Sequence, residues 1–178
     1  SLTSVIIPDS VTSIGGSAFY GCSNLPVIDN IRYADTYLIG AVDKSLTSYT
    51  IKAETRFIGN QAFYQCSSLT SITIPNKVKE IGDSAFDYCT SLTSITIPDS
   101  VTEIGDSAFD YCLSLTSVYC KATTPPALGG TRVFDSNGSG RKIYVPAGSV
   151  EAYKSATRWN EYASAIVGYD FENGVVVE

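Results

Sequence analysis

The protein has 178 residues, no histidine, no methionine, five cysteines and a formal net charge of −6. An acidic chain of this kind lacks the basic patch that binds nucleic acid, so we expect no nucleic-acid partner. No stretch approaches the roughly 18 consecutive apolar residues of a membrane-spanning helix, and we expect no membrane span.

A repeat organises most of the chain. It is anchored on a leucine, recurs in steps of 23, 21, 23, 23 and 23 residues, and reads L-x-x-I-x-I-P-x-x-V-x-x-I-G-x-x-A-F-x-x-C. The units 69–91 and 92–114 are identical at 19 of 23 positions. A period in the twenties predicts a solenoid, because a single coil cannot bury its own apolar side and stacked coils can. The anchors are Leu2, Leu25, Leu46, Leu69, Leu92 and Leu115.

Each regular coil is predicted to begin with a short strand. In the unit that starts at residue 69, Ile72 and Ile74 alternate with Thr73. This period of two places the isoleucines inward and Thr73 outward. Pro75 ends the strand, since it lacks the N–H that a ladder of hydrogen bonds needs.

The rest of the coil is predicted to hold a second short strand and a helical turn. Residues 78–81 form the second extended piece, and Gly82 permits the turn that follows it. Asp83 or Ser84 is expected to cap a short helical turn over residues 84–89.

The second unit departs from the repeat. Residues 25–45 keep the opening leucine but lose the A-F-x-x-C turn, and they contain two alternating runs, VIDNIRY and TYLIGAV, around ADT. We interpret this unit as a β-hairpin inserted into the solenoid.

The C-terminal part, residues 121–178, is predicted to close the stack within the same domain as residues 1–120. Residues 135–142 read as a loop, and the sequence KIYVP at 142–146 mimics SITIP, which predicts one last strand. Ser149 and Thr157 are the expected N-caps of two short helices. The side chains expected to cover the open end of the stack are Tyr153, Trp159, Tyr162 and Ile166.

At the other end, the chain begins on the first letters of a repeat. We therefore expect further coils or another domain to precede residue 1 in the natural protein. The coil at this end would expose an edge that could self-associate, although we expect a monomer.

The cysteines predict a column rather than a disulfide framework. Cys66, Cys89 and Cys112 recur every 23 residues, and Cys120 takes a position that holds an inward isoleucine in other units. In-register stacking separates parallel Cβ atoms by about 4.8 Å, whereas a disulfide needs about 3.8 Å. Buried free thiols are the favoured interpretation, and a metal or redox ladder is the alternative. With no histidine and no CxxC pair, a structural zinc site is not expected.

Acidic residues also form columns. Glu80 is expected to lie over Glu103, Asp83 over Asp106, and Asp87 over Asp110. A calcium site between coils is one possibility, since calcium prefers oxygen ligands, but no D-x-D-x-D-G loop is present. We favour a capping role for Asp83 and Asp106 and expect no metal and no cofactor.

The sequence LTSITIPDSVTEIGDSAFDYC resembles the BspA-type leucine-rich repeat family, and KIYVPAGSVEAYKSATRWNEYASAIVGYD is similar to the C-terminal segment of members from Bacteroides-like bacteria. The resemblance implies a mainly β, right-handed leucine-rich-repeat solenoid with short helices in a C-terminal cap. It also implies an extracellular or outer-surface location and a role in adhesion to host or microbial proteins. The family assigns no catalytic residues, and no catalytic motif is present, so we expect no enzyme.

The best candidate binding surface is the outward column of the first strands. We assign Tyr49, Thr73, Thr96 and Tyr119 to it, because solenoids generally bind along a sheet face and tyrosine is an effective contact residue. The partner would be a surface protein or a glycan; a purely structural spacer is the remaining alternative. A second set of aromatic residues is expected on the turn side, namely Tyr20, Tyr64, Tyr88 and Tyr111.

Overall fold

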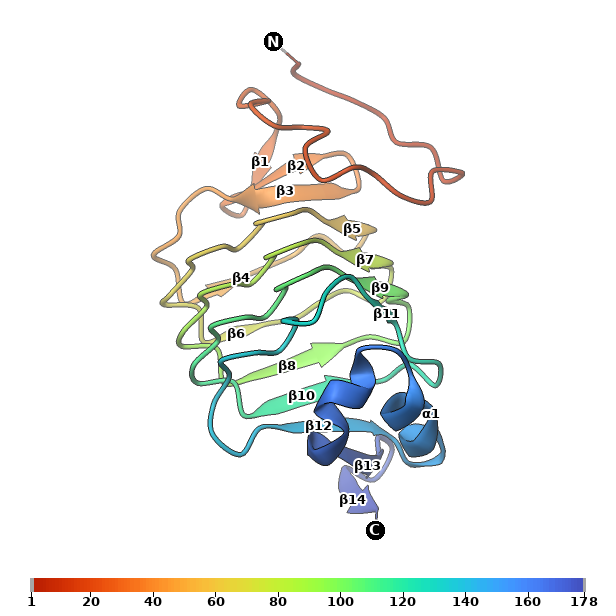
Figure 1. The fold of residues 1–178 in the computed structure, drawn as a ribbon. Helices are drawn as coiled ribbons and strands as arrows, with labels where there is room; N and C mark the ends of the chain where they lie inside the picture. The colour runs from red at the N-terminus through yellow and green to blue at the C-terminus, as the bar shows by residue number, and fades with distance from the viewer. Residues whose placement is uncertain (1, 178) are drawn as a thin grey trace.

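The computed structural model describes residues 2–177 and shows coils stacked along one axis, with the N-terminus at one end and short helices near the other (Figure 1). One seven-stranded sheet contains β1 (Val27–Ile28), β2 (Ile31–Ala34), β3 (Tyr37–Ala41), β5 (Phe57–Ile58), β7 (Glu80–Ile81), β9 (Glu103–Ile104) and β11 (Ala127–Leu128), in that order. A five-stranded sheet contains β8 (Ser94–Ile97), β10 (Ser117–Cys120), β12 (Lys142–Pro146), β13 (Ile166–Asp170) and β14 (Val175–Val177). The strands β4 (Ser48–Tyr49) and β6 (Ser71–Ile72) form a separate pair.

The repeat stacks in register, as predicted. In the seven-stranded sheet β7 and β9 are parallel, with Ile81 opposite Ile104. In the five-stranded sheet β8 and β10 are parallel, with Thr96 opposite Tyr119. Equivalent positions of neighbouring coils are therefore direct neighbours in space, and the fold is the leucine-rich-repeat solenoid.

The core consists of columns of equivalent side chains. Phe63, Phe86, Phe109 and Phe134 are fully buried, and successive ring centroids are 5.1, 5.1 and 5.5 Å apart, with interplanar angles of 12°, 2° and 7°. The anchoring leucines of the regular coils, Leu69, Leu92 and Leu115, are likewise fully buried. Burial of each such side chain contributes roughly 1.5–3 kcal/mol before the cost of ordering the chain is counted.

The predicted cysteine column is present, and the thiols are free. Cys66, Cys89 and Cys112 are buried, and the thiols of Cys89 and Cys112 each donate to a main-chain oxygen of the preceding coil at 3.2 Å. Burial raises the pKa of Cys112 to about 12, which keeps the thiol protonated and unreactive. Cys120 lies opposite Ile97, in the inward position that its sequence predicts.

The turn between the second strand and the end of each coil is not helical, so the predicted helical turn at 84–89 and its cap are wrong. Ser84 and Tyr88 have φ values of 51° and 59°, which interrupt any right-handed helix. Alternate N–H groups of the turn, those of Ser84, Phe86 and Tyr88, bond to the next coil, as in Ser84 N–H to Asp106 O at 2.9 Å. The side chain of Asp83 accepts from the Asp106 N–H at 2.8 Å, so it connects two coils rather than capping its own turn.

The second unit forms the predicted hairpin. Strands β2 and β3 are antiparallel around residues 35–36, and β1 adds a further antiparallel strand through a tight turn at Asp29 and Asn30. Positive φ values of 49° and 63° at these two residues are those of a type I′ turn, which suits Asp and Asn. Strand β3 then pairs in parallel with β5 and returns the chain to the solenoid.

The first coil is less regular than its sequence predicts. Residues 2–26 contain turns but no assigned strand, and Ile6 is 87% exposed. The physical reason is its neighbour: the hairpin presents antiparallel strands, so the first coil has no parallel partner in register. The coil is held by an apolar cluster that joins Ile7 to Tyr37 and Phe57, and by the guanidinium of Arg56, which donates to the main-chain oxygens of Asp9 at 2.9 Å and Val11 at 2.5 Å.

We expect replacement of Arg56 by Ala to release the first coil while the rest of the solenoid stays folded. Loss of several hydrogen bonds to a charged donor removes about 1.5–3 kcal/mol from the docking of residues 2–22. Hydrogen exchange should accelerate in this segment and remain unchanged in β7 and β9. Unaltered protection of the first coil in the variant would show that Arg56 does not hold it, and Arg132→Ala, at an exposed arginine elsewhere, is the matched control.

The C-terminal part differs from the prediction in two ways. Strand β12 is not the last strand, because β13 pairs with it in parallel and β14 pairs with β13 in antiparallel orientation. The predicted second helix is a 3-10 helix, η2 (Trp159–Ala165), followed at once by β13. Thr157 does not cap it; the residue before η2 is Arg158, with a φ of 68°.

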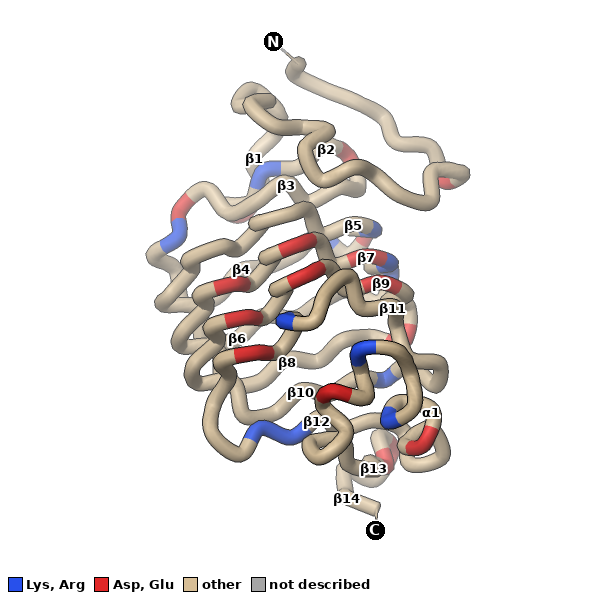
Figure 2. The backbone as a smooth tube through the Cα atoms, in the orientation of Figure 1, with Lys and Arg blue, Asp and Glu red and all other residues tan. Residues whose placement is uncertain are grey.

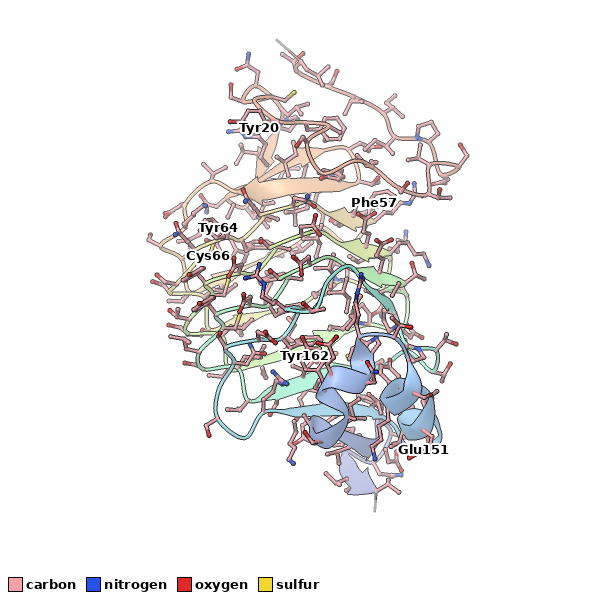
Figure 3. The ribbon with its side chains drawn as sticks, in the orientation of Figure 1. Tyr20, Phe57, Tyr64, Cys66, Glu151 and Tyr162 are labelled. Carbon is pink, nitrogen blue, oxygen red and sulfur yellow. The ribbon has the colours of Figure 1, made fainter. Side chains whose placement is uncertain are left out.

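The first helix and the cap follow the prediction more closely. A 3-10 turn, η1 (Ala147–Ser149), leads into α1 (Val150–Ser155), and Ser149 occupies the N-cap position without a side-chain capping bond. Tyr153, Trp159, Tyr162 and Ile166 are buried against the end of the stack. The hydroxyl of Tyr153 donates to the Ala122 main-chain oxygen at 2.8 Å, and the Trp159 indole donates to that of Pro126 at 2.7 Å. These bonds fix the helices over the last coil, where Figure 3 labels Tyr162.

Candidate binding surface

Three of the four predicted binding residues lie where the sequence places them, on the outward side of the first strands. Thr73 and Thr96 are exposed, and Tyr119 is half-exposed. Thr96 and Tyr119 face the same side of the sheet, because they are paired across β8 and β10. The alternation that buries Ile95 and Ile97 on one side leaves this face to solvent.

The fourth residue, Tyr49, is not on this surface, and its assignment is wrong. Tyr49 pairs with Ile72, an inward position, and its side chain is only 7% exposed. Its hydroxyl donates to the main-chain oxygen of Asp43 at 2.5 Å, and its ring packs against Phe63 at 5.1 Å. In the regular unit, the inward Ile72 lies three residues after the anchor Leu69. Tyr49 lies three residues after its own anchor, Leu46, so the repeat itself places Tyr49 at the inward position and Thr50 at the outward one.

The face continues beyond Tyr119 through aromatic residues that the sequence analysis missed. The ring of Tyr119 stacks on that of Tyr144 at 4.8 Å with an interplanar angle of 16°. Tyr169 contacts both rings, at 5.4 and 5.3 Å, and Phe171 lies 5.0 Å from Tyr169. We call Tyr119, Tyr144, Tyr169 and Phe171 the aromatic face; all four are half-exposed, and they follow β10, β12 and β13 at the C-terminal end of the stack (Figure 1).

The elements explain why these rings meet. Tyr144 is in register with Tyr119, so the similarity of KIYVP to SITIP was a usable signal. Tyr169 reaches the same face only because β13 continues the sheet, which the sequence did not predict. Amphipathic rings held at such spacing offer a firm apolar surface with hydroxyl groups at its border, an arrangement typical of contact sites for other molecules.

A second, narrower set of tyrosines follows the turn side of the coils. The rings of Tyr88 and Tyr111 stack at 4.6 Å with an interplanar angle of 2°, and Tyr64 meets Tyr88 edge-on at 6.0 Å. Figure 3 labels Tyr64 beside Cys66 at this side of the stack. Tyr20 is 91% exposed on the first coil and does not join the column.

The predicted acidic columns are visible as carboxylate-bearing residues stacked on successive coils (Figure 2). Glu80 is paired with Glu103 across β7 and β9. Asp110 is buried, and desolvation raises its pKa, with the nearby Asp135 carboxylate adding to the effect. Desolvation and then the charge of Asp110 raise the pKa of Asp87 in the same way. Within residues 2–177, no group of three or more acidic or cysteine side chains is arranged to hold a metal ion.

These pKa shifts predict a pH-dependent stability. A carboxyl group whose pKa is higher in the folded than in the unfolded state destabilises the fold when it is ionised. This destabilisation is complete above the folded pKa, and it is relieved as the pH falls from the folded pKa toward the unfolded value near 3.8. We therefore expect Asp110→Asn to be more stable than the parent protein at neutral pH. The advantage should vanish below the unfolded pKa of aspartate.

Denaturant titrations at several pH values would test this expectation. The asparagine keeps an oxygen that can accept from the Tyr111 N–H, which Asp110 does at 2.8 Å, so the comparison isolates the charge. Asp99→Asn, at an exposed site outside the columns, is the control. If Asp110→Asn were less stable than the parent protein at neutral pH, the ionised Asp110 carboxylate would not be destabilising, and the prediction would be wrong.

The comparisons with known proteins agree with this architecture. The family model for the BspA type leucine rich repeat region matches residues 1–116 and 41–156, in six copies. A structure described as a leucine rich cell surface protein from Faecalibacterium prausnitzii has a TM-score of 0.56 and 26% identity, and covers 89% of this chain and 50% of that one. A leucine-rich repeat protein from T. pallidum has a TM-score of 0.51 and 25% identity, and covers 82% of this chain and 60% of that one. A comparison with curated proteins finds no significant match.

The chain thus spans half to three fifths of the length of these two solved structures. No helix within residues 2–177 is long and apolar enough to cross a membrane. The repeat, the in-register stack and the match to the family model over most of the sequence lead to one conclusion. The chain belongs to the BspA-type leucine-rich repeat family and is related to a bacterial leucine-rich cell-surface protein.

Proposed function

We propose that this chain is a non-enzymatic interaction module, located outside the cell or on its outer surface, that adheres to a host or microbial surface protein through the aromatic face. The observation that carries the proposal is the cluster of half-exposed, mutually contacting rings of Tyr119, Tyr144, Tyr169 and Phe171 at one end of the sheet. The relationship to a bacterial cell-surface protein supports the location.

The energetics favour a contact site at this cluster. Tyrosine rings supply large contact areas, they lose little conformational entropy on binding, and they are enriched at the centres of protein interfaces. Here each ring is already held by its neighbours, at 4.8 Å for Tyr119 and Tyr144, so a partner meets a preorganised surface. The threonines Thr73 and Thr96 extend this surface along the stack as a polar border.

A binding assay on an array of purified extracellular-matrix proteins and mucins tests the proposal. The triple variant Tyr119→Ser, Tyr144→Ser, Tyr169→Ser should lose at least tenfold in affinity for any partner found, which corresponds to about 1.4 kcal/mol. Tyr64→Ser, a half-exposed tyrosine on the turn side, is the matched control and should bind normally. Binding that survives the triple substitution would place the interaction elsewhere.

The two alternatives give different outcomes in the same assay. A glycan-binding module would show its signal on a glycan array and lose it in Tyr119→Ala. The burial of Tyr49 removes one of the two tyrosines on which a glycan site on this face was predicted. A structural spacer would bind nothing and would tolerate substitutions all along the outward column.

We also expect the chain to be a monomer in solution, with β1 as an exposed edge strand at the N-terminal end that could self-associate. Val27 and Ile28 are both exposed on this edge strand. Light scattering over a range of concentrations would measure the mass, and a concentration-dependent dimer that Val27→Lys abolishes would contradict the expected monomer.

A further inference from the structure

The hairpin of the second unit leaves a gap in the turn side of the solenoid. In regular coils Phe63, Phe86 and Phe109 stack directly on one another and are fully buried. The equivalent residue of the first coil, Phe19, has no such neighbour, because residues 25–45 contain no A-F-x-x-C turn. Phe19 packs on Tyr37 of β3 instead, at 5.2 Å and an angle of 56°, and stays half-buried.

The hydrogen bonds show the same interruption. Among the main-chain N–H groups that the structure describes in residues 25–45, only that of Ala41 donates to the turn of the third unit, where the Ala62 oxygen accepts it at 2.8 Å. The main-chain bonds recorded on the turn of the first coil, such as Tyr20 N–H to Ser17 O at 3.1 Å, stay within that turn. The first turn therefore contacts the third through side chains, as where Gly16 packs closely against the side chain of Asn60, and not through a main-chain ladder.

A cavity of about 270 Å³ lies between these two turns. The hairpin closes one side of it, and the turns of the first and third units form the others. Its lining includes Phe19, Tyr20, Tyr37, Lys44, Asn60 and Gln61, together with backbone at three glycines. None of its lining residues carries a carboxylate, although the chain as a whole is acidic.

We propose that this cavity, formed where the solenoid lacks one turn, binds a single pyranose ring of a glycan. A sugar ring presents C–H groups on its faces and hydroxyl groups around its border, so it needs an aromatic surface beside amide and ammonium donors. Phe19 and Tyr20 provide the rings, and Gln61 and Lys44 provide the polar groups.

The polar groups are held in place to different degrees. Lys44 Nζ donates to the main-chain oxygen of Tyr64 at 2.7 Å and lies 5.6 Å from the centroid of the Tyr64 ring, which fixes it at the rim. The amide of Asn60 is oriented by Asp83, whose N–H it accepts at 2.9 Å. Gln61 is exposed and its side chain is free to turn toward a ligand.

The size and shape of the cavity favour a sugar over a peptide. Its volume is below the range of about 300–1,000 Å³ typical of pockets for larger ligands, so it holds one ring. A peptide strand would need free main-chain groups, but the Ala41 N–H and the Ala62 oxygen are already bonded to each other. The site lies on the turn side near the N-terminal end, where Figure 3 labels Tyr20, and is separate from the aromatic face on the opposite end of the stack.

The test is a titration of the isotope-labelled chain, followed by amide chemical shifts, with the methyl glycosides of glucose, galactose, N-acetylglucosamine and N-acetylneuraminic acid. We expect at least one of them to bind with a millimolar dissociation constant and to shift the amides of Gly16, Gly40 and Gln61. The acidic sugar should bind best if Lys44 contributes its charge, and a neutral sugar if ring stacking dominates.

The variants separate recognition from folding. Gln61→Asn shortens the amide while tolerating the φ of 57° at this position, and should weaken binding roughly tenfold. Gln65→Asn is its matched control, because Gln65 is also exposed with a φ of 60° but lies outside the cavity. Tyr20→Ala, at a side chain that is 91% exposed, should weaken binding without altering stability.

Absence of shifts around the cavity with all four sugars, or equal binding by Gln61→Asn and Gln65→Asn, would overturn the proposal. Shifts produced by indole but by no sugar would also overturn it, by showing a merely apolar hollow. The proposal is independent of protein adhesion, since the triple tyrosine variant of the aromatic face should bind the sugar normally.

Discussion

Replacement of Phe86 by Ala is expected to lower the free energy of unfolding by about 3–5 kcal/mol, the range for removal of a fully buried aromatic side chain. Phe86 is completely buried, and its ring stacks on Phe63 and Phe109, each at 5.1 Å. Its loss removes contacts with both neighbouring coils, so the cavity interrupts the column in the middle of the stack. Equilibrium unfolding in guanidinium chloride would measure the change.

The same experiment should also report on cooperativity. In a solenoid the coils are coupled mainly to their nearest neighbours. A weakened central coil should therefore lower the m-value, the slope of the unfolding free energy against denaturant concentration, or split unfolding into two transitions. Leu113→Ala, at an exposed leucine of the adjacent coil, is the control and should change stability by no more than about 0.5 kcal/mol. A loss below about 1 kcal/mol for Phe86→Ala would show that the aromatic column is not the main source of coil coupling.

Replacement of Trp159 by Ala should be comparably damaging, by about 3–5 kcal/mol, because it removes the largest buried side chain of the C-terminal cap. The indole ring packs edge-on against Tyr153 at 4.9 Å and at a tilt of 42° against Phe134, the last ring of the phenylalanine column, at 5.8 Å. Its N–H also bonds to the main-chain oxygen of Pro126 at 2.7 Å. The substitution therefore separates the cap from the stack and leaves a buried acceptor unpaired.

Trp159→Phe divides this effect into its two parts. The phenylalanine keeps most of the apolar contact but loses the hydrogen bond, which should cost about 1–3 kcal/mol. Hydrogen exchange should then show increased opening of α1 and η2 in the alanine variant, with protection of β7 and β9 retained. Equal loss of protection throughout the chain would mean that the cap and the coils unfold as one unit.

The regular coils could be predicted almost entirely from the sequence, because their geometry depends on local and periodic signals. The alternation of Ile95, Thr96 and Ile97 fixes which side of the strand is buried, and the period of 23 residues fixes which residues become neighbours. Cys89 and Cys112 could be assigned to the core for the same reason. The hairpin of the second unit was also predictable, since it too rests on alternation and turn residues.

Errors arose where tertiary contacts override local preference. Residues 84–89 resemble a capped helical turn in isolation, but every second N–H group, at Ser84, Phe86 and Tyr88, bonds to the next coil, and Ser84 and Tyr88 are held at positive φ. Ile166 and Val167 were predicted as the end of the second helix, but they begin β13, which pairs with the open edge of β12. Neither partner lies close in sequence, so no local pattern could indicate it.

The sequence alone determined the solenoid, its repeat length, the inward columns and the family, because each of these follows from periodicity that every coil repeats. Only the tertiary structure decided where the exposed aromatic residues gather. Tyr119, Tyr144 and Tyr169 meet through strand pairing, and Phe19 and Gln61 enclose a cavity because a missing turn brings their coils opposite each other. The cavity and the Tyr169 end of the aromatic face both lie where the 23-residue repeat is interrupted. There the period no longer shows which residues become neighbours, so only the tertiary structure reveals their packing.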